Sequence, residues 1–581
     1  MKMNLTKIIL GISSVVCLVS CDLDKVPLAT LSPETYFSNE EELRLYSNKF
    51  YEDIVPSASS VFSDRADAII STPLNTEVSG QRTVPATGGG WSWSALRRVN
   101  YLLENSHQTD DIAVRNEYDA LAKFFRAYFY FEKMKRFGDV PWFNEVLGSD
   151  DERLFKPRDS RTLIADSIMQ DLDFAIEYLP TTKDVYRVNK WTALALKSRV
   201  GLFEGTFRKY HGMADAEKYL NACVAASEEL IDNGGYTLYT SGSTPYRDLF
   251  ATPDARSQEI ILARHYDQGL NLTHSVQNAT NASTLGRPGL SKSFVNTYLT
   301  TGGLRFTDQP NYNTREFVQE MQNRDPRLAQ TIRTPGYTRI GGGAAAPNLS
   351  FTVTGYHLIK YTMEQIYDAY DASVNDMPLF RIAETYLNFA EAKAELSTLT
   401  QSDLNKSVNL LRARVGMPAL NLEQANTNPD SYLLNENTGF PNVSEKNTQY
   451  TGVILEIRRE RGIELVMEGH RYYDIMRWKA GKLFEKPFLG MYFSRLGDFD
   501  LDGNGTIDLC LYQGTRPGSS ASLFMEVGQD IVLSEGTRGH VVAHGNINRK
   551  FDEVEGKDYL YPIPSEEINL SNGTLKQNPR W

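Results

Sequence analysis

The stretch TGVILEIRRERGIELVMEGHRYYDIMRWKA, residues 451–480, decides the fold of this chain. Between residues 454 and 468, apolar side chains alternate with charges at helical spacing, without proline and with one interior glycine, which predicts a helix. Gly469 suits the left-handed residue that ends a helix, and residues 470–479 have enough apolar content for a second helix at an angle. The sequence therefore predicts a corner between two helices.

Charged side chains gather in this corner. Arg461, Glu464, Glu468 and Arg471 follow one another at i, i+3, i+7 and i+10, so they would share one face of a continuous helix. Such a cluster is a candidate ligand site, but a charge run on a helix is more often a solvated or internally paired face. We adopt the structural interpretation, in which paired charges hold the C-terminal helices together.

Several segments resemble one known family in the same order along the chain. ERGIELVMEGHRYYDIMRW (460–478) resembles the C-terminal signature of the SusD/RagB family, glycan-binding lipoproteins of the outer membrane. FFRAYFYFEKMKRFGDVPWF (124–143) and YLYPIPSEEINLSNGTLKQNPRW (559–581) are similar to two more family segments. WSALRRVN (93–100) resembles the family's aromatic-x-x-apolar-x-x-x-Asn pattern.

The resemblance implies a mainly α fold, with tetratricopeptide-like helix pairs forming a right-handed superhelical scaffold packed on an irregular, loop-rich half with short strands. One domain, 35–581, would hold the scaffold at about 35–240 and 376–482. The irregular part would lie at about 56–93, 241–375 and 485–557, where Gly, Pro, Asn and Ser are frequent. Periodicity predicts helices at 39–54, 113–137, 161–179, 189–210, 214–233, 379–397 and 402–415, and strands at 258–264 and 351–361. A further helix is predicted to open at Trp91-Ser92-Trp93 and to run through Asn100 to about His107.

Residues 1–20 have the form of a signal peptide: two lysines precede an apolar run that is too short to span a bilayer. Leu-Val-Ser-Cys at 18–21 resembles a lipobox, which implies that the mature chain begins at an acylated Cys21 followed by a tether over 21–34. Each buried methylene contributes about 0.8 kcal/mol to membrane anchoring. The acidic residues Asp22 and Asp24 resemble the surface-export signal of Bacteroidetes lipoproteins. The alternative is an ordinary secretory signal in which the cysteine is incidental.

Composition and motifs exclude several classes of protein. The chain has 61 basic residues, and loss of the two signal-peptide lysines leaves 59 against 73 acidic residues, a formal charge of −14. This charge argues against nucleic acid or an anionic membrane surface as the partner. Only Cys223 and Cys510 remain free to pair, and no HExxH, GxSxG, GxxxxGK[ST] or GxGxxG element occurs. We expect a binding protein with no enzymatic activity.

The best local motif is DLDGNGTID at 500–508. Oxygen-bearing side chains at positions 1, 3, 5 and 9 and a glycine at position 6 match the calcium loop of an EF-hand. Position 12 is Leu511, where that loop has a bidentate Glu, so another residue such as Asp498 must complete the shell. The alternative is an Asp/Gly-rich turn held by local hydrogen bonds. The predicted Ca²⁺ ligands are Asp500, Asp502, Asn504, Thr506 through its carbonyl, Asp508 and Asp498.

Sugar binding requires flat aromatic faces for the C–H faces of the ring, and Asp, Asn or Arg for its hydroxyls. The irregular segments supply both kinds of residue, and Trp91 and Asp67 are our first choices. Each candidate has an alternative role as a packed aromatic or a hydrogen-bonded loop anchor. The full candidate set is Trp91, Asp67, Arg65, Trp93, Arg82, Tyr337 and Tyr312.

The resemblance implies a surface-exposed outer-membrane lipoprotein that binds an oligosaccharide and passes it to a SusC-like TonB-dependent transporter. Two alternatives stay open. A surface glycan hydrolase would need two carboxylates roughly 5 to 9 Å apart beside the aromatic platform. A binder of a peptide or another non-glycan nutrient is the other alternative.

Overall fold

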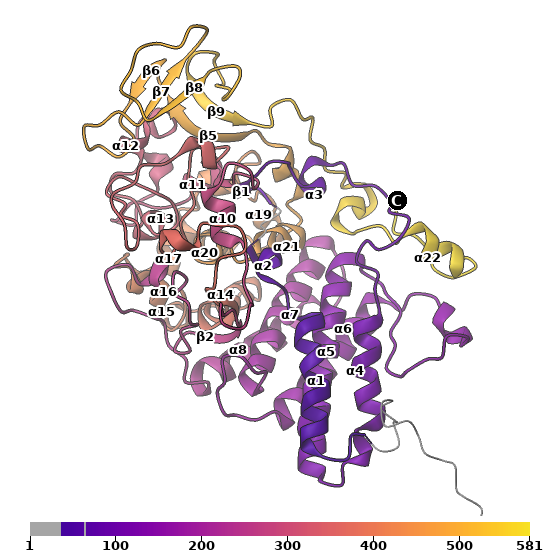
Figure 1. Cartoon of the computed structure of the whole chain (residues 1–581). Helices are drawn as coiled ribbons and strands as arrows, with labels where there is room; N and C mark the ends of the chain where they lie inside the picture. Colours follow the sequence, from indigo (N-terminus) through magenta and orange to yellow (C-terminus); the bar gives the residue numbers. More distant parts are fainter. Residues whose placement is uncertain (1–35, 63–65) are drawn as a thin grey trace, which may run out of the picture.

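Antiparallel helices form one half of the protein and irregular segments with short strands form the other, as the computed structural model of the chain shows (Figure 1). The structure describes residues 36–62 and 66–581. The predicted signal peptide, the tether with Cys21, and Arg65 lie outside these residues. Within them, no helix is both long enough and apolar enough to cross a membrane.

The N-terminal helices pack in sequence order, α5 against α6 and α7 against α8. Close packing of the second pair depends on Gly201 of α7, because a Cβ there would lie 2.7 Å from the Tyr219 carbonyl oxygen of α8. The predicted helices in this region are confirmed to within a few residues. The helices are α1 (Glu40–Ile54), α4 (Ser94–Asn105), α5 (Ile112–Phe137), α6 (Arg161–Tyr178), α7 (Lys190–His211) and α8 (Ala216–Asn233).

The C-terminal helices differ from the prediction in two places. The helix predicted at 379–397 begins at Ile382, because residues 377–381 form strand β4, which pairs antiparallel with β2. The helix predicted at 402–415 is broken at Ser407, whose hydroxyl donates to the Asp403 carbonyl oxygen. The elements are β4 (Met377–Arg381), α14 (Ile382–Glu395), α15 (Gln401–Asn405), α16 (Val408–Arg414), α17 (Leu422–Thr427), α18 (Ser431–Leu434), α19 (Asn442–Lys446), α20 (Thr451–Leu465) and α21 (Arg471–Arg477).

The irregular half contains only short elements. The strand predicted at 258–264 is confirmed as β2 (Ile260–Arg264), but the strand predicted at 351–361 is wrong. Gly355 turns the chain there with a φ of 93°, and the segment makes only isolated bridges. The other elements are α2 (Ala58–Phe62), β1 (Ile69–Ile70), α3 (Thr76–Ser79), α9 (Pro245–Asp248), α10 (Val276–Asn281), β3 (Gly289–Leu290), α11 (Lys292–Val295), α12 (Phe317–Glu320) and α13 (Pro326–Ala329).

Residues 485–557, predicted to be irregular, contain five strands (orange to yellow in Figure 1). β5 pairs antiparallel with β9, and a second sheet has the order β6-β7-β8. The sequence did not predict these strands, because the segment is rich in glycine and each strand is short. Each strand is paired only when the chain folds. The strands are β5 (Phe488–Phe493), β6 (Gly497–Phe499), β7 (Leu509–Tyr512), β8 (Leu523–Glu526) and β9 (Gly539–Ala543), and the last helix is α22 (Ser565–Leu570).

The predicted helix corner is confirmed at the centre of the molecule. α20 ends at Leu465, and the chain turns through Met467 and Gly469, whose φ angles are 64° and 79°. Every residue of α20 except Gly462 is buried, so the helix has no solvated charged face. Its charges must therefore be paired inside the protein.

The pairing partners of this corner come from other elements. Glu464 accepts hydrogen bonds from Arg381 of β4 at 2.8 Å and from Arg414 of α16 at 2.6 Å. Glu468 contacts Arg381 at 2.7 Å and Lys360 at 2.6 Å. These ion pairs fasten α20 to the strand, to a neighbouring helix and to the irregular half. Further buried pairs are Arg327–Glu460, Arg412–Glu460, Arg461–Asp474, Arg477–Asp474 and Arg477–Glu391.

We expect Glu468→Ala to lower the free energy of unfolding by about 3–5 kcal/mol, because it leaves Arg381 and Lys360 buried with less compensating charge. Urea unfolding of the purified variant measures this change. Glu535→Ala removes a carboxylate that is half exposed and paired with Arg538, so it should cost about 1 kcal/mol or less. Equal stability of the two variants would contradict the structural role of Glu468.

Acid should remove part of this stability. Burial alone would raise the pKa of Glu391, but the Arg477 guanidinium lowers that pKa to about 2. The ionised Glu391 carboxylate therefore contributes about 3 kcal/mol to the free energy of unfolding at neutral pH. This contribution is fully present above 4.5, the pKa of Glu391 in the unfolded chain, and is lost as the pH falls toward 2. We expect Glu391→Gln to lower the urea midpoint at pH 7 and to flatten its dependence on pH between 4.5 and 3. An unchanged pH dependence would refute this assignment.

Candidate functional site

The two predicted tryptophans lie together at the start of α4. Trp91 is only 5% exposed, and its ring meets Phe137 and Trp93 edge to face with centroids 4.9 and 5.4 Å apart. Trp93 is half-buried and also contacts Phe143, at 5.6 Å. Trp91, our first choice, therefore offers no open face on which a sugar ring could stack.

Both tryptophans line a cavity of about 340 Å³ between α4, residues 141–155 and α22. A pyranose would place hydroxyl groups against its apolar walls, where they would lose hydrogen bonds to water. Asn100 Nδ2 already donates to the Phe143 and Glu145 carbonyl oxygens, so this side chain has only its Oδ1 left to offer a ligand. The apolar walls include Trp91, Trp93, Phe143, Leu147, Leu154, Phe155, Leu570 and Leu575.

Asp67 and Arg82 have internal partners. Both carboxylate oxygens of Asp67 accept hydrogen bonds from Arg471, at 2.8 and 2.9 Å, so Asp67 fastens the 66–90 segment to α21. The Arg82 guanidinium donates to Asp558 and lies 4.7 Å from the centroid of the Tyr561 ring. These contacts correspond to the alternative role of loop anchor. The third charged candidate, Arg65, lies outside the described residues.

The two predicted tyrosines lie in separate places. Tyr337 is 6% exposed and packs under the Arg247 guanidinium, whose carbon is 5.0 Å from the ring centroid. Tyr312 is half-buried, and its ring edge approaches Phe306 and Tyr432 at 6.2 and 6.4 Å. The six candidates that the structure describes thus do not converge on one site; among them, only the two tryptophans share a cavity.

A residue that the sequence reasoning missed is better placed for stacking. Tyr370 is 75% exposed, more than any other large apolar or aromatic side chain in the described residues except Ile366, which is equally exposed. Leu270 and Leu272, in a neighbouring loop, are 63% and 48% exposed. The signal was present in the segment QIYDAYDA, 365–372, where tyrosines without helical or strand periodicity stand between acidic residues.

The loop that carries Tyr370 is held in one conformation by side chains from two other segments. Asp368 Oδ1 accepts hydrogen bonds from Gln277 and Arg339, at 3.0 and 2.8 Å. Asp371, with a φ of 53°, donates its amide hydrogen to the Ser275 hydroxyl at 2.9 Å. A ring on a preorganised loop loses little conformational entropy when a ligand binds.

The predicted calcium loop joins β6 to β7. Carboxylate oxygens of Asp500, Asp502 and Asp508 lie within 4.8 Å of one another. Asp500 also accepts hydrogen bonds from the amides of Gly503 and Gly505, both at 2.7 Å, which wraps the backbone around the carboxylates. Burial, and then the neighbouring charges of Asp502 and Asp500, raise the pKa of Asp508. Oxygens so arranged suit a hard cation.

Two further positions of this motif do not join the cluster. The carboxylate of Asp498 accepts a hydrogen bond from Ser519 at 2.7 Å, and it is not among the three converging residues. Leu511, at position 12, is buried in β7 opposite Gly497. The prediction that Asp498 completes the shell is therefore not supported by the geometry.

Two family models match the sequence. The first, described as SusD family, matches residues 254–581, which is more than half of the chain. The second, described as starch-binding associating with outer membrane, matches residues 92–202.

Known proteins and solved structures are also similar to this chain. A SusD-like protein of Formosa agariphila is 22% identical over 530 residues, which cover 82% of this chain and 90% of the relative. A SusD-like protein from Bacteroides fragilis has a TM-score of 0.68 at 22% identity, over 96% of this chain and 100% of the other. A SusD-like carbohydrate binding protein from the same species has a TM-score of 0.68 at 19% identity, over 92% and 99%.

The buried corner at 451–480, the helical scaffold with its irregular half and the family match over residues 254–581 lead to one conclusion: this chain belongs to the SusD family.

Proposed function

We propose that the protein is a non-catalytic, surface-exposed outer-membrane lipoprotein that binds an oligosaccharide and passes it to a SusC-like TonB-dependent transporter. Family membership supports sugar binding, since a structural neighbour is described as carbohydrate binding and one matching family model as starch-binding. The lipobox-like residues 18–21 support anchoring through Cys21.

The exposed ring of Tyr370 is the observation that carries the proposal for the binding site. Pyranose rings bind proteins through their C–H faces on an open aromatic ring, with polar groups beside it for the hydroxyls. Tyr370 meets the first requirement, and Asp368, Asp371 and Arg339 lie on or against the same loop. We assign sugar stacking to Tyr370 in place of Trp91.

We expect Tyr370→Ala to weaken binding of a recognised glycan about tenfold, or about 1.4 kcal/mol, without lowering stability. Affinity electrophoresis against a panel of polysaccharides identifies the ligand, and calorimetry measures the change. Tyr178→Ala, on α6 with a side chain 37% exposed, is the matched control and should bind as the wild type does.

The same experiment discriminates the two candidate sites. Trp91→Ala should lower stability by about 3–5 kcal/mol, because it empties a buried ring position, while the folded variant keeps its glycan affinity. Loss of affinity in Trp91→Ala together with full binding by Tyr370→Ala would place the sugar in the tryptophan cavity. Release of shorter sugars during the incubation would favour the hydrolase alternative.

We also propose that the 500–508 loop binds Ca²⁺. Side-chain oxygens of Asp500, Asp502, Asn504 and Asp508, with the Thr506 carbonyl, would hold the ion. Bound Ca²⁺ would offset two of the three negative charges of the converging carboxylates and fix the β6–β7 connection.

Calcium should raise the thermal midpoint of the wild-type protein above its value in EGTA. A ligand at 100 times its dissociation constant stabilises the folded state by about 2.7 kcal/mol. Asp500→Asn should abolish the calcium-dependent shift, and Asp498→Asn, which changes a carboxylate outside the cluster, should retain it. Equal midpoints of the wild type in calcium and EGTA would refute the site.

A further inference from the structure

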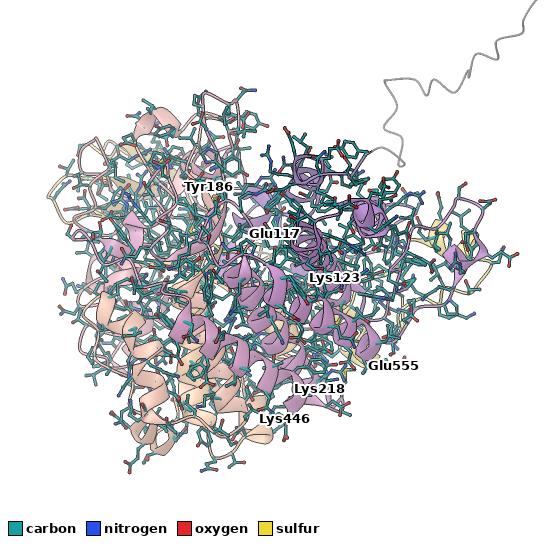
Figure 2. All side chains as sticks on the ribbon, turned by 90° about the horizontal axis from the view of Figure 1, so that it is seen from below. Glu117, Lys123, Tyr186, Lys218, Lys446 and Glu555 are labelled. Atoms are coloured by element: carbon teal, nitrogen blue, oxygen red, sulfur yellow. The ribbon has the colours of Figure 1, made fainter. Side chains whose placement is uncertain are left out.

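A groove of about 300 Å³ lies between α1 of the helical scaffold and strand β2 of the irregular half. It is separate from the tryptophan cavity and from the Tyr370 loop. Tyr186, which lines it, lies in the upper middle of Figure 2, where the violet helices meet the pink segments. The other lining residues important here are Tyr51, Arg187, Arg264, His265 and Glu52.

A buried carboxylate fixes two rings of this groove. Asp376, 4% exposed, accepts a hydrogen bond from the Tyr186 hydroxyl at 2.6 Å and from His265 Nδ1 at 3.0 Å. The backbone amides of Ala255 and Tyr266 also donate to it, at 3.0 and 2.8 Å. The Tyr186 and His265 rings lie with centroids 4.8 Å apart. His265 Nε2 makes no hydrogen bond with the residues that the structure describes.

Two arginines of the groove differ from those of the central network. Arg187 donates to Asn48 Oδ1 at 2.7 Å and lies 4.6 Å from the Tyr51 ring centroid. Arg264 donates to the Val55 carbonyl oxygen at 2.9 Å. Within residues 36–62 and 66–581, neither guanidinium has a carboxylate at ion-pair distance. Both are half-buried and each makes one hydrogen bond with the described residues, so further N–H donors remain for a ligand.

The only carboxylate among the lining residues is already neutralised. Glu52 lies 2.6 Å from Lys49 Nζ on the same helix. Arg187 and Arg264 are thus the two basic side chains that line the groove, while the negative charge of Asp376 is buried behind Tyr186 and His265 and satisfied by four donors, on a chain of formal net charge −12. Because the protein as a whole repels polyanions, an acidic ligand would bind there through specific contacts and not through general attraction.

We infer that this groove binds the carboxylate or sulfate group of an acidic oligosaccharide, with Arg187 and Arg264 as donors to the anion. The Tyr186 and His265 rings form the adjoining wall, and His265 Nε2 is available to a sugar hydroxyl. This assignment rests on the proposed oligosaccharide binding and specifies its substrate class. Guanidinium groups suit both carboxylate and sulfate because their N–H donors lie in one plane.

Calorimetry at 150 mM NaCl with oligogalacturonate, a chondroitin sulfate oligosaccharide and neutral maltoheptaose tests the inference. We expect at least one acidic ligand to bind, and the stronger of the two shows whether carboxylate or sulfate is preferred. Arg187→Gln and Arg264→Gln should each weaken that ligand at least tenfold. Arg538→Gln, which makes the same charge change at an exposed residue, should have no effect.

The outcomes separate the inference from the function on which it rests. One result would overturn the groove assignment alone: a neutral glycan binds in a Tyr370-dependent way, while acidic ligands either do not bind or bind both arginine variants as they bind the wild type. Binding of monomeric galacturonate that is lost in Arg187→Gln, without binding of any oligosaccharide, would support the groove and count against oligosaccharide capture. Unchanged thermal midpoints of the Gln variants exclude misfolding as the cause of a loss.

Discussion

Paired charge inside the protein is the constraint on which the rest of the structure depends. α20 carries Arg and Glu side chains into the centre of the fold, where unpaired charge would cost several kcal/mol for each ion. Each charge is met by a partner on a different element, as Glu464 is by Arg381 and Arg414. Since these partners are far apart in sequence, the network fixes how the scaffold helices meet the irregular half.

This rigid centre allows the surrounding loops to be irregular. The loop with Tyr370 has only one 3₁₀ turn, Gln365–Tyr367, yet Gln277 and Arg339 hold it through hydrogen bonds to Asp368. The same principle operates at the groove, where Asp376 satisfies four donors and fixes Tyr186 and His265. In both places a ring is presented by a polar anchor on a loop, and not by an apolar face of a helix.

The contrast between arginines is informative about function. In the central network Arg381 and Arg477 are buried against carboxylates, so their charge is used within the fold. Arg187 and Arg264 lie at the boundary of the two halves with only neutral oxygens as hydrogen-bond partners. The position of a guanidinium and the charge of its partners therefore distinguish a structural arginine from one available to a ligand.

The sequence by itself determined the helical scaffold, the corner after Leu465 and the acidic loop at 500–508, because each depends on local spacing or on a glycine in a left-handed conformation. Only the tertiary structure decided which side chains are available to a ligand. Trp91 and Tyr370 are both aromatic residues of irregular segments. The ring of Trp91 is covered by packing against Phe137, whereas the ring of Tyr370 is open to solvent. Likewise, the sequence shows Asp67 and Arg82 only as polar loop residues. In the folded chain Asp67 pairs with Arg471 and Arg82 pairs with Asp558, each more than 400 positions away. Burial and long-range pairing are properties of the folded chain, and no local pattern encodes them.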